Sequence, residues 1–485
     1  MDKGDFTRAQ YTAVVSDLHL CEEEPINLKF PLWKKYKTRQ FFFDKQFEGF
    51  LRHIEGKAGG LPVELVLDGD IFDFDSVVSL PESPPYRVSW LEKNRGLHPQ
   101  EIKSIYKIEK IFKDHDVWVA ALGEFVRRGN KAIFVIGNHD LELHFPKVQK
   151  KIIEALQLNE EEKLLVRFVE WFYISNEDTL IEHGNQYDPY CVATDPVSPF
   201  VLKFNRIEVR IPFGNLATRY LINGMGFFNP HVDSNFIMSA KEYVVFFFRY
   251  IAKAQPFLMF TWMWGSVMVL LQSFLDSLLS PLREPLEIEG RIEDIAKRSN
   301  ATPRMVRELR ALTVAPATSH PWLIFKELWL DRALLVLIAM VLLFELFLVI
   351  DNIYSISFFW IFIPFSLFLP FFVFYSKSVF SEVQEYKVPK EKILVIASLI
   401  TKVKRIIYGH THVVRHERIG PVEHLNSGTW SPAFEDVECE RPIDQKTYVW
   451  LYPVGREERS AKVLQYKDGM DYDVFSKKNT GRRKI

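Results

Sequence analysis

The stretch VELVLDGDIFDFD, residues 63–75, joins a short apolar run to a cluster of carboxylates. Its first five residues have the composition of a buried strand, because short apolar runs bounded by turn residues are typical of parallel-sheet cores. The acidic side chains from Asp68 onward follow the end of that strand. Ligands bind beyond the carboxyl ends of strands in open α/β sheets. The stretch therefore predicts an α/β fold with a site at one edge of a sheet.

Similar apolar runs occur on both sides of this stretch. The expected strands lie at residues 11–15, 131–136, 179–182, 405–409, 423–430, 447–454 and 461–467. Apolar residues at helical spacing separate several of them, most clearly at residues 101–128. Such alternation predicts layered β-sheets flanked by helices.

The middle of the chain has a different composition. Three hydrophobic runs lie at residues 254–275, 333–350 and 353–375, and only the second contains a charged residue. Uncharged runs of about 18 or more residues are candidate membrane helices, although core helices of a large soluble domain give the same pattern. We expect a discontinuous catalytic domain, residues 1–200 and 390–475, interrupted by a helical membrane-associating insertion at residues 201–389. Residues 476–485 would form a flexible basic tail.

Composition narrows the class of protein. The 61 basic and 62 acidic residues nearly cancel, so we expect no nucleic-acid partner. The cysteines are three and far apart, which argues against a disulfide scaffold or a thiolate zinc site and favours a reducing compartment. The first ten residues are charged and polar. We therefore expect no cleaved leader, and membrane attachment would come from inside the chain.

Five of the apolar runs are followed by residues that can bind metal ions. The candidate ligands are Asp17, His19, Asp70, Asn138, His183, His410 and His412. Residues two apart, such as Asp17 and His19, can point the same way at a strand end. Each residue alone could equally be a core or capping group. Together they are too many for one tetrahedral ion, and they suit two ions that share a bridging carboxylate.

In their order along the chain, these blocks resemble the D-x-H, G-D-x-x-D, G-N-H-D/E, H and G-H-x-H motifs of the calcineurin-like metallophosphoesterase superfamily. The resemblance implies a metallophosphoesterase fold and two divalent ions, with manganese favoured over iron or zinc. It assigns the first ion to Asp17, His19 and His412, the second to Asn138, His183 and His410, and the bridge to Asp70. It makes His139, with Asp140 behind it, the proton donor or phosphate-orienting group. Asp73 would orient the loop of Asp70 or cap a helix.

Within that superfamily, DLHL at residues 17–20 and GDIFDF at residues 69–74 are most similar to the UDP-2,3-diacylglucosamine hydrolase branch. Enzymes of that branch cut the pyrophosphate of a lipid A precursor at the membrane surface. This chain departs from the branch at His139, where the branch has Arg, and at Asn185, where it usually has Asp. The interval between the fourth and fifth motifs is also far longer here. The resemblance therefore implies the type of reaction but not the substrate.

The metal ligands constrain how the insertion can meet a membrane. His183 and His410 flank the insertion and are expected to bind the same ion, so the number of crossings between them must be even. We favour a hairpin of residues 333–350 and 353–375, with Arg332 and Lys377 at its cytoplasmic ends. The run at 254–275 would then lie in the interface, dip and return, or pack against the hairpin. An alternative hairpin of residues 254–275 and 333–350 is disfavoured, because it would export a loop rich in Lys and Arg. A monotopic insertion, which does not cross the membrane, also gives an even number of crossings.

These inferences lead to one favoured function and two alternatives. We expect a dinuclear-metal phosphohydrolase of the cytoplasmic membrane, facing the cytoplasm, that cleaves a phosphate ester or pyrophosphate of a lipid-linked substrate by metal-activated water. The first alternative is a membrane-tethered phosphoesterase for a soluble nucleotide or phosphoprotein. The second is a membrane scaffold with a vestigial site, which the complete ligand set disfavours. The sequence leaves the oligomeric state open.

Overall fold

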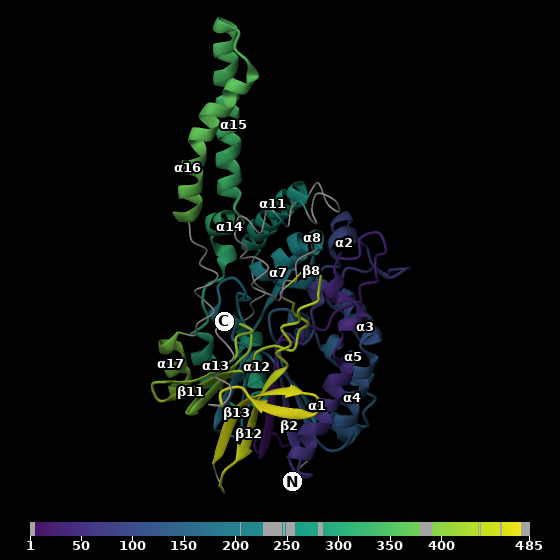
Figure 1. Ribbon diagram of the computed structural model, residues 1–485. Coiled ribbons are helices and arrows are strands. Elements are labelled where there is room, and N and C mark those ends of the chain that lie inside the picture. Colours follow the sequence, from purple (N-terminus) through teal and green to yellow (C-terminus); the bar gives the residue numbers. More distant parts are fainter. Residues whose placement is uncertain are drawn as a thin grey trace.

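The computed structural model describes residues 5–476, except residues 204, 227–244, 246–247, 249–257, 280–284, 379–389, 435, 437 and 456–457. It consists of a globular part built on two β-sheets, from which a helical hairpin projects (Figure 1). Most of the expected flexible tail at 476–485 lies outside the described residues.

The first sheet has seven strands in the order β14-β13-β12-β1-β2-β3-β4. Its parallel half consists of β1 (Tyr11–Val15), β2 (Val63–Asp68), β3 (Lys131–Val135) and β4 (Val166–Val169). Its antiparallel half consists of β12 (Thr447–Pro453), β13 (Arg459–Lys467) and β14 (Met470–Asp473). Because β12 pairs with β1, the C-terminal segment completes a sheet that the N-terminal segment begins.

The second sheet has five strands in the order β10-β11-β9-β6-β5. They are β5 (Phe172–Ser175), β6 (Thr179–Glu182), β9 (Arg405–Tyr408), β10 (Arg415–Ile419) and β11 (Val422–Asn426). β6 and β9 are parallel neighbours although the whole insertion separates them in sequence. A small hairpin of β7 (Phe200–Lys203) and β8 (Arg206–Val209) stands apart.

Apolar side chains fill the space between and outside the sheets. Val14 and Val66 of the first sheet pack with Ile181 and Ile407 of the second, so the two sheets face each other. The outer face of the first sheet is covered by α1 (Asp44–Lys57), α3 (Glu101–Asp114), α4 (Asp116–Arg127) and α5 (Pro146–Ala155). The outer face of the second is covered by α12 (Pro285–Arg298), α13 (Pro303–Arg310) and α17 (Glu391–Thr401). The protein is therefore an α/β fold with mixed sheets flanked by helices, as the sequence predicted (Figure 1).

The expected helix at residues 101–128 is two helices. His115 separates α3 from α4, and its ring is held on both sides, with Nδ1 2.8 Å from Asp44 Oδ1 and Nε2 3.0 Å from the Cys21 carbonyl. These two tertiary contacts hold the chain at a break that the apolar spacing does not reveal.

The described part of the insertion contains both buried and exposed helices. One group of helices that pack against one another consists of α7 (Phe213–Ala217), the π-helical turn η6 (Thr218–Ile222), α8 (Asn223–Met225), α11 (Leu258–Ser277) and α14 (Pro321–Glu327). The projecting hairpin consists of α15 (Leu330–Tyr354), η10 (Phe358–Ile361) and α16 (Phe362–Ser378). Short elements elsewhere are η1 (Lys35–Lys37), η2 (Arg39–Phe41), η3 (Phe74–Ser76), α2 (Trp90–Arg95), η4 (Leu141–His144), α6 (Glu160–Lys163), η5 (Asn185–Tyr187) and η9 (Ala317–Ser319).

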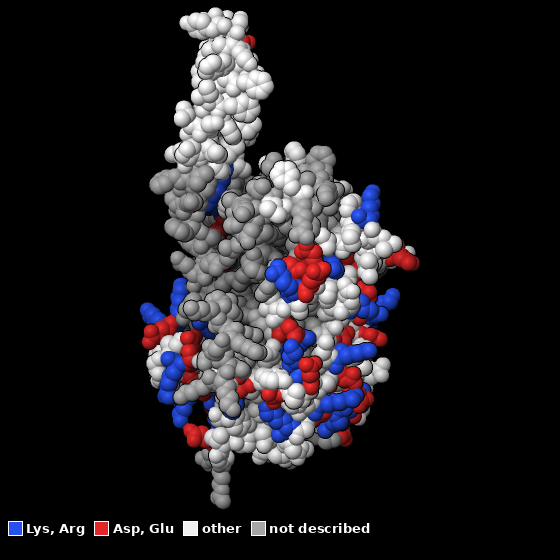
Figure 2. All heavy atoms as spheres, in the orientation of Figure 1, with Lys and Arg blue, Asp and Glu red and all other residues white. Residues whose placement is uncertain are grey.

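The hairpin is apolar along its length and polar at its base. Among the described residues, α15 is the one helix long and apolar enough to cross a membrane, and residues 358–372 form a shorter apolar helical segment. At the base, Asp331 accepts a hydrogen bond from the Tyr375 hydroxyl, at 2.9 Å, and lies 3.1 Å from the Arg332 guanidinium. Figure 2 shows that Lys, Arg, Asp and Glu cover the globular part and are almost absent from the visible face of the hairpin.

Candidate metal centre

The predicted ligands come together at one edge of the two-sheet core. Loops after β1, β2 and β3 supply ligands from the first sheet, and loops after β6 and β9 supply the rest from the second. The ligands that these loops carry are Asp17, His19, Asp70, Asn138, His183, His410 and His412. The first five are buried, and the last two are half-buried. Because the strands end at a common edge, residues distant in sequence become neighbours there.

Three of the ligands form a first cluster. Asp17, His19 and His412 offer donor atoms that all lie within 4.8 Å of one another. Asp17 Oδ1 is 3.0 Å from His412 Nε2 and 3.8 Å from His19 Nε2. One carboxylate facing two imidazoles is a donor set that suits manganese, iron or zinc.

A second cluster lies beside the first. Asp70, His183 and His410 also offer donor atoms within 4.8 Å of one another. Asp70 Oδ2 is 3.2 Å from His183 Nε2 in this cluster and 4.0 Å from His19 Nε2 in the first. The Asp70 carboxylate therefore stands between the two clusters, within 4.0 Å of an imidazole of each.

Two buried atoms have the orientation that metal ligation requires. His183 Nδ1 is 2.8 Å from the Asp68 carbonyl, so it carries the proton and leaves the lone pair on Nε2. The Nε2 lone pair of His183 then faces the Asp70 carboxylate at 3.2 Å, and Asn138 Oδ1 has no hydrogen-bond partner among the described residues. A lone pair facing a carboxylate and an unpaired buried oxygen are both costly, and a bound cation would satisfy both atoms. The residues therefore fit divalent ions, whose identity and number the geometry leaves open.

Left-handed backbone conformations place most of the ligands. Positive φ angles occur at Asp17 (55°), His19 (50°), Asp70 (53°), His410 (62°) and His412 (56°). This conformation is uncommon for residues with a side chain, because it costs free energy. Such strained residues cluster at functional sites, where the surrounding structure holds them in place. The pairs two residues apart therefore reach the centre through turns rather than through extended strand ends.

Gly69 makes the loop of Asp70 possible. Its φ is 75°, and a Cβ at this position would lie 2.4 Å from the His183 ring. A larger residue would displace the His183 imidazole, so the glycine is required both by the turn and by the close approach.

His139 lies beside both clusters. Its ring centroid is 5.0 Å from that of His19, and its main-chain N–H donates to Asp70 Oδ1 at 2.7 Å. Its Nδ1 is 3.3 Å from Asp73 Oδ1. Burial alone would lower the pKa of His139, but the charges of Asp70 and Asp73 outweigh it and raise that pKa to about 10. An imidazolium at this place can donate a proton.

Asp140 does not stand behind His139 as expected. Its carboxylate accepts hydrogen bonds from the main-chain N–H groups of Gly137, at 2.6 Å, and Ile71, at 2.8 Å. Burial and the nearby Asp70 raise the pKa of Asp140 to about 7. Asp140 therefore links the loop after β2 to the loop after β3 by hydrogen bonds. Asp73 supplies the carboxylate beside His139. Asp73 also caps η3, accepting from the Ser76 N–H at 3.0 Å, which is the capping role expected for it.

Sequence reasoning missed Asp188. Its Oδ2 lies 3.1 Å from His410 Nε2, and its Oδ1 accepts from the Tyr190 N–H at 2.8 Å. Asp188, Cys191 and His410 also form a group of potential metal ligands. The only sequence signal was proximity, because Asp188 follows His183 in the same loop.

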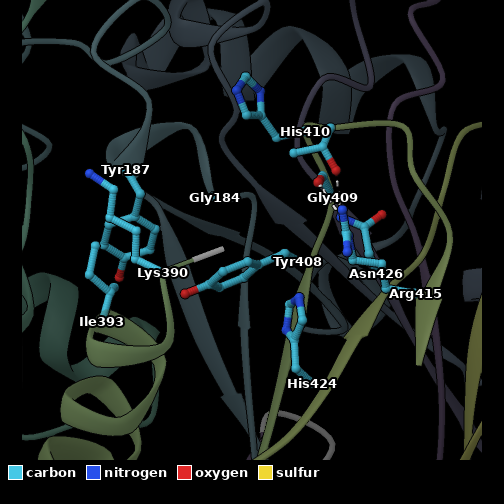
Figure 3. Close-up of a pocket in the computed structure, with 11 residues that line it drawn as sticks. Gly184, Tyr187, Lys390, Ile393, Tyr408, Gly409, His410, Arg415, His424 and Asn426 are labelled. Carbon is cyan, nitrogen blue, oxygen red and sulfur yellow. Dashed lines mark hydrogen bonds between the residues drawn. The ribbon is translucent and has the colours of Figure 1, made fainter. Parts of the chain in front are cut away.

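A small pocket lies beside His410, one of the candidate ligands. Figure 3 shows Tyr408 between Tyr187 and His424, with the His410 ring pointing away from Tyr408. The hydroxyl of Tyr187 donates to Glu182 at 2.9 Å, and burial raises the pKa of Glu182 to about 8. The pocket adjoins the second cluster through His410, which is part of its lining.

The arrangement brings six of the seven predicted ligands and His139 into one centre, and the seventh, Asn138, precedes His139 in the loop after β3. A scan against protein-family models and a search of curated proteins return no match to this chain. The assignment of the centre rests on the geometry of its residues.

Proposed function

We propose that this protein is a membrane-associated phosphohydrolase with two divalent metal ions, of the metallophosphoesterase fold. The observation that carries the proposal is the position of Asp70, whose carboxylate lies between two separate clusters of imidazole and carboxylate ligands. Paired ions that share a ligand are suited to in-line attack on phosphorus. A lone structural ion would not need two such clusters side by side.

The residues around the clusters have distinct tasks in this reaction. Bound ions would supply Lewis acidity toward a phosphoryl oxygen and lower the pKa of a water molecule. Asp73 holds His139 at Nδ1, so we expect Nε2 to carry the proton that passes to the leaving oxygen. Asp140 and Gly69 keep the ligand loops in place while the phosphoryl group is transferred.

The hairpin favours a lipid-linked substrate. Large apolar side chains such as Leu342, Phe359 and Leu367 are more than half exposed on α15, η10 and α16. Hydrocarbon is the environment that accommodates a helix that is apolar on every side. Because β6 and β9 are adjacent, the ends of the insertion lie on the same side of any bilayer, whether α15 and α16 span it or only enter it.

A substrate screen of detergent-purified protein with added Mn²⁺ tests the proposal. It compares UDP-2,3-diacylglucosamine, a soluble nucleotide pyrophosphate and a generic phosphodiester, with Asp70→Asn as the inactive control. We expect long-chain substrates to be preferred over short-chain analogues with the same head group. Equal rates at all chain lengths would favour a soluble substrate, and no hydrolysis of any phosphorus ester would refute the proposal.

A further inference from the structure

The insertion supplies a side chain that touches a metal ligand. Asn215, on α7, is fully buried, and its Nδ2 donates to the Asn138 carbonyl at 2.9 Å. Its Oδ1 accepts a hydrogen bond from Asn138 Nδ2 at 3.3 Å. The side-chain amide of Asn138 is therefore held by its nitrogen, and its oxygen is buried without a hydrogen-bond partner among the described residues, available to a cation.

The orientation of Asn215 is itself fixed. Its Nδ2 also donates to Asp75 Oδ2, at 2.8 Å. Because a carboxylate accepts and an amide oxygen does not donate, the reversed orientation of Asn215 would lose this bond. Asp75 is buried as well, and Asn223 of α8 donates to its main-chain oxygen at 2.8 Å. The bonds between the side chains thus run in one direction, from Asn138 through Asn215 to Asp75, and Asn215 also donates to the main chain of Asn138.

This order matters because the two ends of an asparagine amide are not equivalent toward a cation. The oxygen is a ligand, whereas the NH₂ group offers only donors. Groups that orient metal ligands often contribute strongly to metal affinity. A freely turning Asn138 would present its oxygen to the centre only part of the time.

We propose that Asn215 is a positioning residue of the metal centre, so that the insertion takes part in metal binding as well as in membrane contact. The inference rests on the proposed metal-dependent function. α7 and η6 pack against α11, whose Gly265 approaches so closely that a Cβ there would lie 2.9 Å from the Tyr220 carbonyl. The helix that carries Asn215 therefore packs directly against the apolar α11.

The test compares Asn215→Ala with a matched control, Asn223→Ala, in the full-length protein. Asn223 is also a buried asparagine of the insertion, and its side chain donates to the main chain of Asp75, which is not a predicted metal ligand. Isothermal titration with Mn²⁺ and no substrate measures the affinity of each site. We expect Asn215→Ala to weaken one of two sites by roughly 10–100-fold, and Asn223→Ala to leave both sites close to wild type.

Thermal unfolding without metal shows whether the two variants are destabilised to a similar extent. The inference is overturned if Asn215→Ala binds Mn²⁺ like the wild type, or if both variants lose affinity equally. If Asn215→Ala does not fold, Asn215→Ser replaces it in the same comparison. A wild-type protein that fails to bind two Mn²⁺ ions would instead refute the proposed function, so the two failures are distinguishable.

Discussion

Charges placed in the projecting hairpin should release the protein from membranes. Leu337 and Leu342 of α15 are 57% and 63% exposed and lie near the middle of the helix. With 25 residues, α15 is roughly 37 Å long, which exceeds the ~30 Å hydrocarbon core of a bilayer. We therefore choose the double substitution Leu337→Arg and Leu342→Arg, which places both charges within the hydrocarbon.

The size of the effect follows from transfer energies. Exchanging a leucine for an arginine near the centre of a membrane helix costs about 3–4 kcal/mol on insertion scales. Two exchanges cost about 6–8 kcal/mol if they add, which lowers the partition into the bilayer by roughly 10⁴- to 10⁶-fold. An effect of this size exceeds what differences in expression can produce.

The assay is extraction of membranes with alkaline carbonate, followed by quantification of the protein in pellet and supernatant. The control carries the same two charges at Leu61 and Leu399, which are 48% and 72% exposed on the globular part. We expect the wild type and the control in the pellet and the hairpin variant in the supernatant. A hairpin variant that stays in the pellet at the wild-type yield would refute the assignment of α15 to hydrocarbon.

Four further outcomes are expected. Asp70→Asn should abolish hydrolysis and weaken both Mn²⁺ sites, as seen by titration, because its carboxylate serves both clusters; an unchanged second site would contradict the bridge. His139→Asn should lower kcat by about 10²- to 10⁴-fold at near-normal metal content; loss of metal, measured by elemental analysis, would contradict its role as proton donor. Asp188→Ala should weaken one Mn²⁺ site by roughly 10–100-fold, whereas Asp195→Ala, which removes a buried carboxylate paired with Arg310, should not. Chelation should lower the Tm, and Mn²⁺ at about 100 times its Kd should restore about 2.7 kcal/mol of stability for each occupied site; a Tm that neither treatment changes would argue against resident ions.

The sequence predicted much of the fold because its strands are short, apolar and followed by polar loops. The run at 179–182 coincides with β6, and that at 11–15 coincides with β1. The ligands could be predicted for the same reason, since strand ends that meet at one edge bring their loops together. The close spacing of carboxylate and imidazole residues within these loops, such as Asp17 and His19, then favoured metal binding over other kinds of chemistry.

Contacts between distant segments could not be predicted in this way. Asn215 is 77 residues from Asn138, and no local pattern relates the two. The carboxylate beside the His139 ring comes from Asp73 rather than from the neighbouring Asp140. In this loop the main-chain N–H of His139 donates to Asp70, and the Asp140 carboxylate accepts from the main-chain N–H of Gly137. The expected insertion boundaries likewise did not reveal that α12 and α13 pack into the core over the second sheet.

The parallel pairing of β6 with β9 has a consequence for how the protein is made. The ribosome completes Asp17 through His183 before the hairpin, and it produces His410 and His412 only afterwards. Neither ligand cluster can be complete until the chain has left the sheet, formed the insertion and returned beside β6. A chain truncated before His410 therefore lacks a ligand in both clusters at once. Metal uptake by a newly made molecule would then signal that its biosynthesis has finished.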